Sequence, residues 1–122
     1  MKRIIYMIFD RYLRKKAIKK HRKMWRWLAE NPGKGKLSYL MLYDPKADLE
    51  RDCYLCEYAI NKAMPYEIII SRYCNHCPLH WNGSECNSYF SLYADWFHSK
   101  LNSEERAKLA RQIAELPERK DR

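Results

Sequence analysis

The sequence predicts a small, mainly α-helical domain with little β structure, made of about four helices around a four-cysteine metal site. Three observations lead to this prediction. Apolar residues recur at three- and four-residue steps in several stretches, which is the spacing of amphipathic helices. The chain has 122 residues, enough for one domain with a modest core. Two Cys-x-x-Cys pairs are separated by 17 intervening residues, a spacing typical of a tetrahedral zinc site.

The first predicted element is a basic amphipathic segment over residues 1–30, as one long helix or two shorter ones. Its basic residues are expected on the side that faces water. Asn31-Pro32-Gly33 should end it, because Gly suits a left-handed cap and Pro cannot continue a helix. The apolar positions with helical spacing are Ile5, Phe9, Tyr12, Leu13, Ala17, Met24, Trp25 and Leu28.

Shorter elements follow in a predicted helical domain over residues 31–117. Residues 37–43 fit either a short helix or a strand. The first cysteine pair is expected on a turn that runs into a helix over 57–63, and residues 67–71 have the composition of a strand. The charged tail 118–122 is expected to fray.

Two further helices are predicted before that tail. The stretch 89–101 has Phe90, Tyr93, Ala94 and Phe97 at helical spacing on one face. Ser103 is expected to cap a last helix over 104–116, whose first turn is acidic. Since no long linker interrupts the sequence, the whole chain should be one folding unit.

The cysteine pairs predict a structural zinc site. Zinc binds about four sulfur or nitrogen ligands, and two residues between cysteines let both thiolates of one turn face the same ion. Four cysteine ligands leave no open position for substrate, so the site should stabilise the fold, by roughly 10 kcal/mol if it resembles zinc-finger peptides. The predicted ligands are Cys53, Cys56, Cys74 and Cys77.

Alternatives to this ligand set remain open. The spacing also fits an iron–sulfur cluster, and His76, His80 or Cys86 could join or replace a ligand. A disulfide pair is disfavoured, because the short apolar run at residues 4–9 lacks a cleavage site and should not direct export. It is also too short to insert into a membrane. A cytoplasmic, reducing compartment favours metal over disulfides.

The formal net charge of +9 lies in the first quarter of the chain, where residues 1–30 carry eleven Lys and Arg against Asp10 and Glu30. A charged run is often only a solvated helix face, but nine basic residues without an acid in residues 11–26 exceed ordinary surface composition. Such a segment indicates contact with nucleic acid or an acidic surface. The candidate contact residues are Arg11, Arg14, Lys15, Lys16, Lys19, Lys20, Arg22, Lys23 and Arg26.

The sequence shows no arrangement that predicts an enzyme. Asp95 and His98 could share a helix face, but two groups do not make a hydrolytic site, and a surface pair is the simpler interpretation. The glycines at residues 33–36 lack the spacing of a phosphate-binding loop. Two mutually spaced cysteine pairs favour metal over a redox disulfide.

Several short motifs cover most of residues 25–117 and spare the basic N-terminal segment. They are Trp25-x-Trp27-Leu28 with Asn31-Pro32-Gly33-Lys34, Cys53-x-x-Cys56-Glu57-Tyr58-Ala59, Cys74-x-x-Cys77-Pro78-Leu79-x-Trp81, Cys86, Tyr93-x-x-Trp96, and Leu109-Ala110-x-Gln112-Ile113-Ala114-x-Leu116-Pro117. In these motifs the chain resembles uncharacterised small cysteine-rich proteins encoded by bacteriophages and prophages. The resemblance implies a compact, metal-binding protein in the cytoplasm of a bacterial host, and it implies no activity.

Two functions therefore compete at the level of sequence. In the first, the basic helix binds the phosphates of DNA or RNA, with Tyr12, Trp25 and Trp27 available to stack on bases if they are exposed. In the second, the protein modulates a bacterial host or its defence by binding a host protein, with the basic helix docked on an acidic surface and aromatic residues in the interface. Attachment of residues 4–9 to a lipid surface is a more distant possibility.

Overall fold

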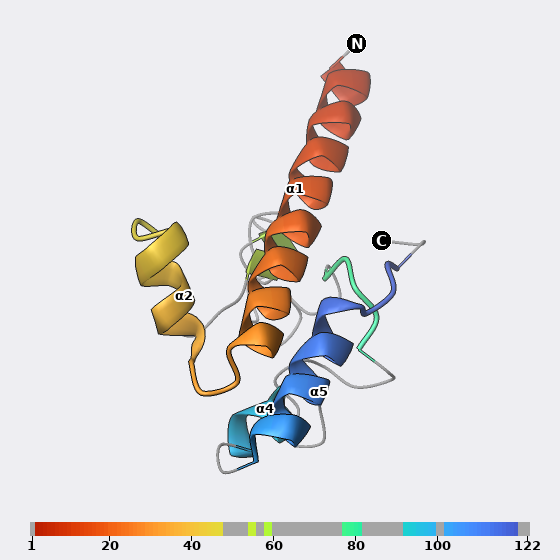
Figure 1. Cartoon of the computed structure of the whole chain (residues 1–122). Coiled ribbons are helices and arrows are strands. Elements are labelled where there is room, and N and C mark those ends of the chain that lie inside the picture. Colours follow the sequence, from red (N-terminus) through yellow and green to blue (C-terminus); the bar gives the residue numbers. More distant parts are fainter. Residues whose placement is uncertain are drawn as a thin grey trace.

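The structure is a computed structural model that describes residues 2–47, 54–55, 58–59, 77–81, 92–99 and 102–119, with side chains from residue 8 onward. These residues form the helices α1 (Lys2–Glu30), α2 (Lys36–Tyr43), α4 (Leu92–His98) and α5 (Ser103–Ala114) (Figure 1). Their β structure is limited to an isolated antiparallel bridge between Leu79 and Glu118. The prediction of a mainly α-helical fold is confirmed.

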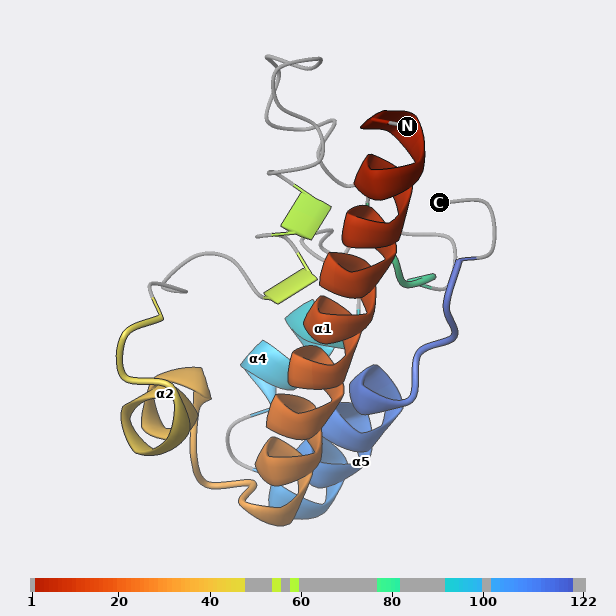
Figure 2. The ribbon, with the colours of Figure 1, turned by 90° about the horizontal axis from the view of Figure 1, so that it is seen from above.

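Helix α1 is the longest of the described helices, with 29 residues. Its C-terminal half packs along α5, with α2 on its other side, whereas its N-terminal half extends beyond both helices (Figures 1 and 2). This arrangement divides the predicted apolar positions of α1. Met24, Trp25 and Leu28 are fully buried, but Phe9 and Tyr12 are 58% and 59% exposed, since α1 extends beyond α2 and α5 at its N-terminal half.

The core lies where α1, α4 and α5 meet. The indole rings of Trp25 and Trp96 pack edge to face at 4.8 Å, a geometry that aromatic pairs favour. Ile113 of α5 is fully buried in the same hydrophobic cluster. On α4 the buried residue is Trp96. Of the apolar face expected for this stretch, Tyr93 packs against the core beside Trp25, whereas Phe97 is about half exposed. The C-terminal half of α1, from Ile18 to Ala29, therefore belongs to the same core as the C-terminal helices.

The helix ends follow their local sequence. Helix α1 ends at Glu30, because Pro32 has no N–H to continue the helix. The backbone and side-chain amides of Asn31 both donate to the Trp27 carbonyl at 2.9 Å and so satisfy one of the last carbonyls. At the start of α5 the cap is Asn102, whose side-chain oxygen accepts from the Glu105 amide at 3.0 Å. The expectation that Ser103 caps this helix was wrong by one position. Asn and Ser are equally good caps, and composition alone does not separate two adjacent candidates.

The 37–43 stretch, which fitted a helix or a strand, is helix α2. One side of α2 packs on α1 through aromatic rings, with the ring centres of Tyr39 and Tyr43 at 5.6 and 6.2 Å from that of Trp27. The other side faces solvent: Leu37, Met41 and Leu42 are each about two-thirds exposed. The sequence did not predict this exposed apolar face.

The segment after α5 runs antiparallel to residues 77–81. The His80 amide donates to the Pro117 carbonyl at 2.9 Å, and the Arg119 amide donates to the Pro78 carbonyl at 2.8 Å. Glu118 and Arg119 are thus held by backbone hydrogen bonds, where fraying from residue 118 was expected. Residues 120–122 lie outside the described residues, as do the predicted strand 67–71 and most of the predicted helix 57–63; residues 58–59 of that helix have helical backbone.

Candidate nucleic-acid interface

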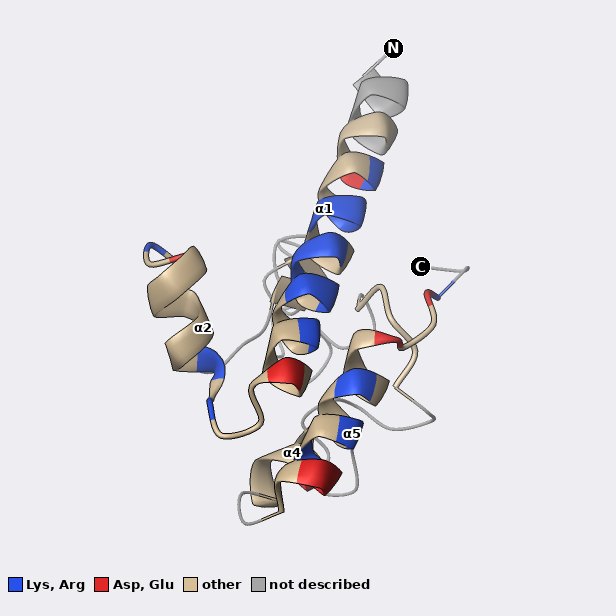
Figure 3. Cartoon of the chain, in the orientation of Figure 1, with Lys and Arg blue, Asp and Glu red and all other residues tan. Residues whose placement is uncertain are grey.

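The structure places most of the predicted basic contact residues on one exposed side of α1. Helical spacing puts them roughly opposite Ala17, His21 and Leu28, which are buried in the core. Figure 3 shows Lys and Arg along α1 from its middle to near its end. We call these exposed side chains the cationic face of α1; they are Arg11, Lys15, Lys16, Lys19, Lys20, Lys23 and Arg26.

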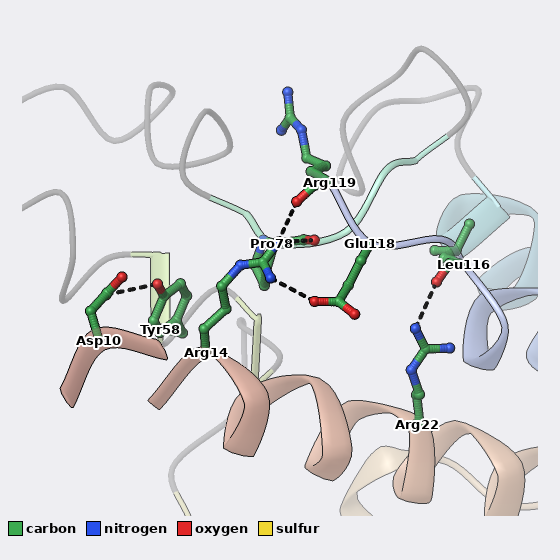
Figure 4. Close-up of polar contacts among 8 residues, drawn as sticks. All are labelled: Asp10, Arg14, Arg22, Tyr58, Pro78, Leu116, Glu118 and Arg119. Carbon is green, nitrogen blue, oxygen red and sulfur yellow. Dashed lines mark hydrogen bonds and ion pairs between the residues drawn. The ribbon is translucent and has the colours of Figure 1, made fainter. Parts of the chain in front are cut away.

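Two of the nine predicted contact residues are engaged within the fold. Arg14 is only 17% exposed; it pairs with the Glu118 carboxylate at 2.6 Å and donates to the carbonyls of Pro78 and Arg119 (Figure 4). Arg14 therefore joins α1 to both of the paired segments, 77–81 and 117–119. Its main role in the structure is to hold these segments together.

Arg22 has a similar internal role at the end of α5. Its two terminal nitrogens donate to the carbonyls of Ala114 and Leu116, each at 3.1 Å. The last carbonyls of a helix have no partner within the helix and carry partial negative charge. The Arg22 guanidinium satisfies two carbonyls in this region and places a positive charge where the dipole of α5 favours one.

The remaining cations make weaker contacts within the protein. Arg26 lies 3.4 Å from Glu115, and both side chains are more than half exposed, so this pair adds little stability. Lys20 lies over the ring of Tyr54 and Lys23 over that of Tyr43, at 5.4 and 5.7 Å from the ring centres. These cations keep access to solvent and to a charged partner.

The aromatic residues proposed to stack on bases behave differently from one another. Trp25 is buried in the core and is not available for stacking. Trp27 is partly buried against Tyr39. Tyr12 is exposed among the cations of α1, which leaves it as the stacking candidate on this helix.

Only one of the four predicted zinc ligands, Cys77, falls within the described residues. It is buried, at 7% exposure. Cys53, Cys56 and Cys74 lie outside the described residues, as do the alternative ligands His76 and Cys86. His80, the third alternative, is exposed. The part of the chain that is described contains no cluster of three or more metal-binding side chains.

Contacts to one turn of α1 come from the neighbours of both cysteine pairs. The hydroxyl of Tyr58, two residues after Cys56 in sequence, donates to Asp10 at 2.8 Å. The carbonyl of Pro78, which follows Cys77 directly, accepts from Arg14 (Figure 4). Asp10 and Arg14 are one helical turn apart, about 6 Å along the axis. Residues adjoining the two cysteine pairs thus approach the same part of α1.

Sequence reasoning missed a buried histidine in the middle of the basic run. His21 is completely buried, and its Nε2 atom lies 3.0 Å from the carbonyl oxygen of Ile113. Since a carbonyl only accepts, Nε2 carries the proton and donates. The signal for this burial was available, because His21 lies four residues after Ala17 and four before Trp25, both of which are in the core.

Burial changes the acidity of two groups near the core. Desolvation lowers the pKa of Arg106, whose guanidinium lies 4.3 Å from the centre of the Trp96 ring. Desolvation, with smaller contributions from Asp44 and Tyr43, raises the pKa of the Tyr39 hydroxyl. Both groups pack against tryptophan rings, Arg106 against Trp96 and Tyr39 against Trp27, and contribute to the fold.

Comparison with known proteins adds no relative. No protein family, curated protein or solved structure is significantly similar to this chain. In the described part of the chain, no helix has the combined length and apolar content needed to cross a bilayer.

Proposed function

We propose that this protein binds nucleic acid through the cationic face of α1, on a fold stabilised by zinc, in the cytoplasm of a bacterial host. The observation that carries the proposal is that the two sides of α1 have different roles. The buried side of the helix supplies core residues such as Met24 and Leu28, whereas the seven cations of the cationic face remain exposed. Exposed lysines of this density are not needed for packing.

The size of the cationic face suits a phosphate backbone. From Arg11 to Arg26 the helix rises about 22 Å at 1.5 Å per residue. Neutralising about six phosphates would make log Kd change with log salt concentration with a slope of about 5, because bound counterions are released. Neither sequence-specific readout nor a preference for DNA over RNA is required by this argument.

The decisive experiment is a binding titration across a salt series with mixed-sequence duplex DNA and single-stranded RNA. A variant with Lys15, Lys16, Lys19 and Lys20 changed to Ala should fold and lose binding. A charge-matched control changes four exposed cations away from α1, namely Lys34, Lys46, Lys108 and Arg111, to Ala. Equal loss of affinity in both variants would mean that net charge, and not the cationic face, causes binding.

The zinc proposal rests on the cysteine spacing and gains support from Cys77 and the contacts around it. Cys77 is buried, and the neighbours of both cysteine pairs approach the same turn of α1, through Asp10 and Arg14. We expect purified protein to carry about one zinc ion per chain, which Cys74→Ser removes and Cys86→Ser retains. Retention of zinc by Cys74→Ser would contradict this ligand set, and visible absorbance with bound iron would favour the iron–sulfur alternative.

A second function, binding of a host protein by a phage-type protein, is favoured by one specific observation. Leu37, Met41 and Leu42 form an exposed apolar face on α2, and such patches often mark protein interfaces. If the protein binds a host protein, the variant with Lys15, Lys16, Lys19 and Lys20 changed to Ala should lose only a modest part of its affinity for that partner. Leu42→Ser should lose more. Salt would matter less than it does for nucleic acid.

A further inference from the structure

A cavity of about 260 Å³ lies at one edge of the cationic face, between α1 and the segment that follows α5. Its lining is dominated by α1 side chains, with one residue from the C-terminal segment. The lining residues are Lys15, Ile18, Lys19, Arg22, Arg26 and Glu118. Four cations, one carboxylate and one apolar side chain therefore surround a concave space on an otherwise convex helix.

The charges around this cavity are not balanced within the described part of the protein. The Glu118 carboxylate is already paired with Arg14, which is not part of the lining. Arg26 has Glu115 as a partner. No acidic side chain among the described residues pairs with Lys15, Lys19 or Arg22, so the cavity retains a surplus of positive charge.

Arg22 adds a fixed component to this surplus. Its guanidinium is held by the carbonyls of Ala114 and Leu116, which orient the group without neutralising its charge. Lys15 and Lys19 are long and exposed, so their ammonium groups can move toward a ligand. One oriented guanidinium with mobile ammonium groups is a combination suited to a phosphate group.

We propose that this cavity binds a phosphomonoester, namely the terminal phosphate of a nucleic-acid strand. A phosphomonoester carries about −1.5 to −2 charges at neutral pH, which matches the surplus better than the single charge of a backbone phosphodiester. The cavity is slightly smaller than typical sites for whole small-molecule ligands, which start near 300 Å³. It therefore suits a phosphate and part of its sugar. The inference rests on the proposed nucleic-acid function and adds a preference for strand ends.

The test compares single-stranded oligonucleotides of one sequence, about 12 nucleotides long and so within known site sizes. They carry a 5′-phosphate, a 3′-phosphate or only hydroxyl ends, and binding is followed by fluorescence anisotropy. We expect one phosphorylated end to bind about tenfold more tightly, the factor for one added charge-assisted hydrogen bond. This preference should shrink below about pH 6, where the monoester loses its second charge.

Two charge-matched variants locate the effect. Lys15→Ala/Lys19→Ala removes two lining cations and should abolish the preference for the phosphorylated end. Arg11→Ala/Lys16→Ala removes two cations of the same helix that do not line the cavity. This variant should lower the affinity for all the oligonucleotides by a similar factor and keep the preference for the phosphorylated end.

The outcomes separate this inference from the function on which it rests. Tight binding without any end preference, or a preference that survives in Lys15→Ala/Lys19→Ala, overturns the inference and leaves nucleic-acid binding in place. A nucleoside 5′-monophosphate is titrated in parallel by NMR. Binding of the monophosphate through Lys15 and Lys19, without binding of oligonucleotides, would support the phosphate site but assign it to a free nucleotide. No binding of any of these ligands refutes both proposals.

Discussion

Arg22 offers a direct test of how the structure divides its cations between stability and binding. In Arg22→Met the aliphatic stem is retained, but the two hydrogen bonds to the carbonyls of Ala114 and Leu116 are lost. Hydrogen bonds to a charged group contribute about 1.5–3 kcal/mol when buried. The partly exposed position of Arg22 lowers that value, and the loss of a cation at the end of α5 adds about 0.3–1 kcal/mol.

The free energy of unfolding should therefore fall by about 2–3 kcal/mol, which corresponds to a drop in Tm of about 8–12 °C for a chain of this length. The matched control is Arg26→Met, one turn later on α1, whose exposed pair with Glu115 is worth about 0.5 kcal/mol or less. Both variants remove one cation from the same helix, so general charge repulsion cancels in the comparison. Circular dichroism during urea unfolding measures the free energy of unfolding of both variants. If the two variants differ by less than about 0.5 kcal/mol, Arg22 does not stabilise the end of α5.

Three further predictions concern the fold. Asn102→Ala should lower the free energy of unfolding by about 1 kcal/mol, whereas Ser103→Ala should change it little; the reverse order would reassign the cap. Trp25→Ala should cost about 3–5 kcal/mol and remove near-ultraviolet dichroism from its contact with Trp96. Because the pKa of Tyr39 is raised in the folded state, its stabilising effect is complete below about pH 10, the unfolded pKa, and is lost as pH rises through the folded pKa. Urea unfolding between about pH 9 and 11 should therefore show a smaller loss of stability for Tyr39→Phe than for wild type.

The sequence was sufficient for the mainly helical class and for the approximate positions of α1, α4 and α5, whereas it left residues 37–43 open between helix and strand. Local spacing and the Asn31-Pro32-Gly33 stop predicted α1, and the acidic first turn and apolar period predicted α5. These signals act within a few residues, so they can be read without knowing the tertiary structure. The class of fold depended on them alone.

The parts that sequence could not supply depend on contacts between distant segments. Arg14 and Lys15 are adjacent basic residues, yet Arg14 meets the Pro78 carbonyl and Lys15 lines a cavity. Likewise, Phe9 has the spacing of a core residue but lies in the part of α1 that extends beyond α2 and α5, and it is exposed. Which side of a helix receives a neighbour, and how far along its length, is decided by packing of the whole chain.

The pairing of the first helix with the last has a consequence for synthesis. The Arg22 side chain finds its partners 92 and 94 residues later in the chain, and His21 bonds to Ile113. Synthesis proceeds at about 5–20 residues per second, so roughly 5–20 s pass between the synthesis of α1 and that of α5. During that interval the apolar side of α1 lacks its main cover while its cations are already present. A chain that stops before residue 113 would keep α1 in this incomplete state, so premature termination should yield a basic, aggregation-prone fragment.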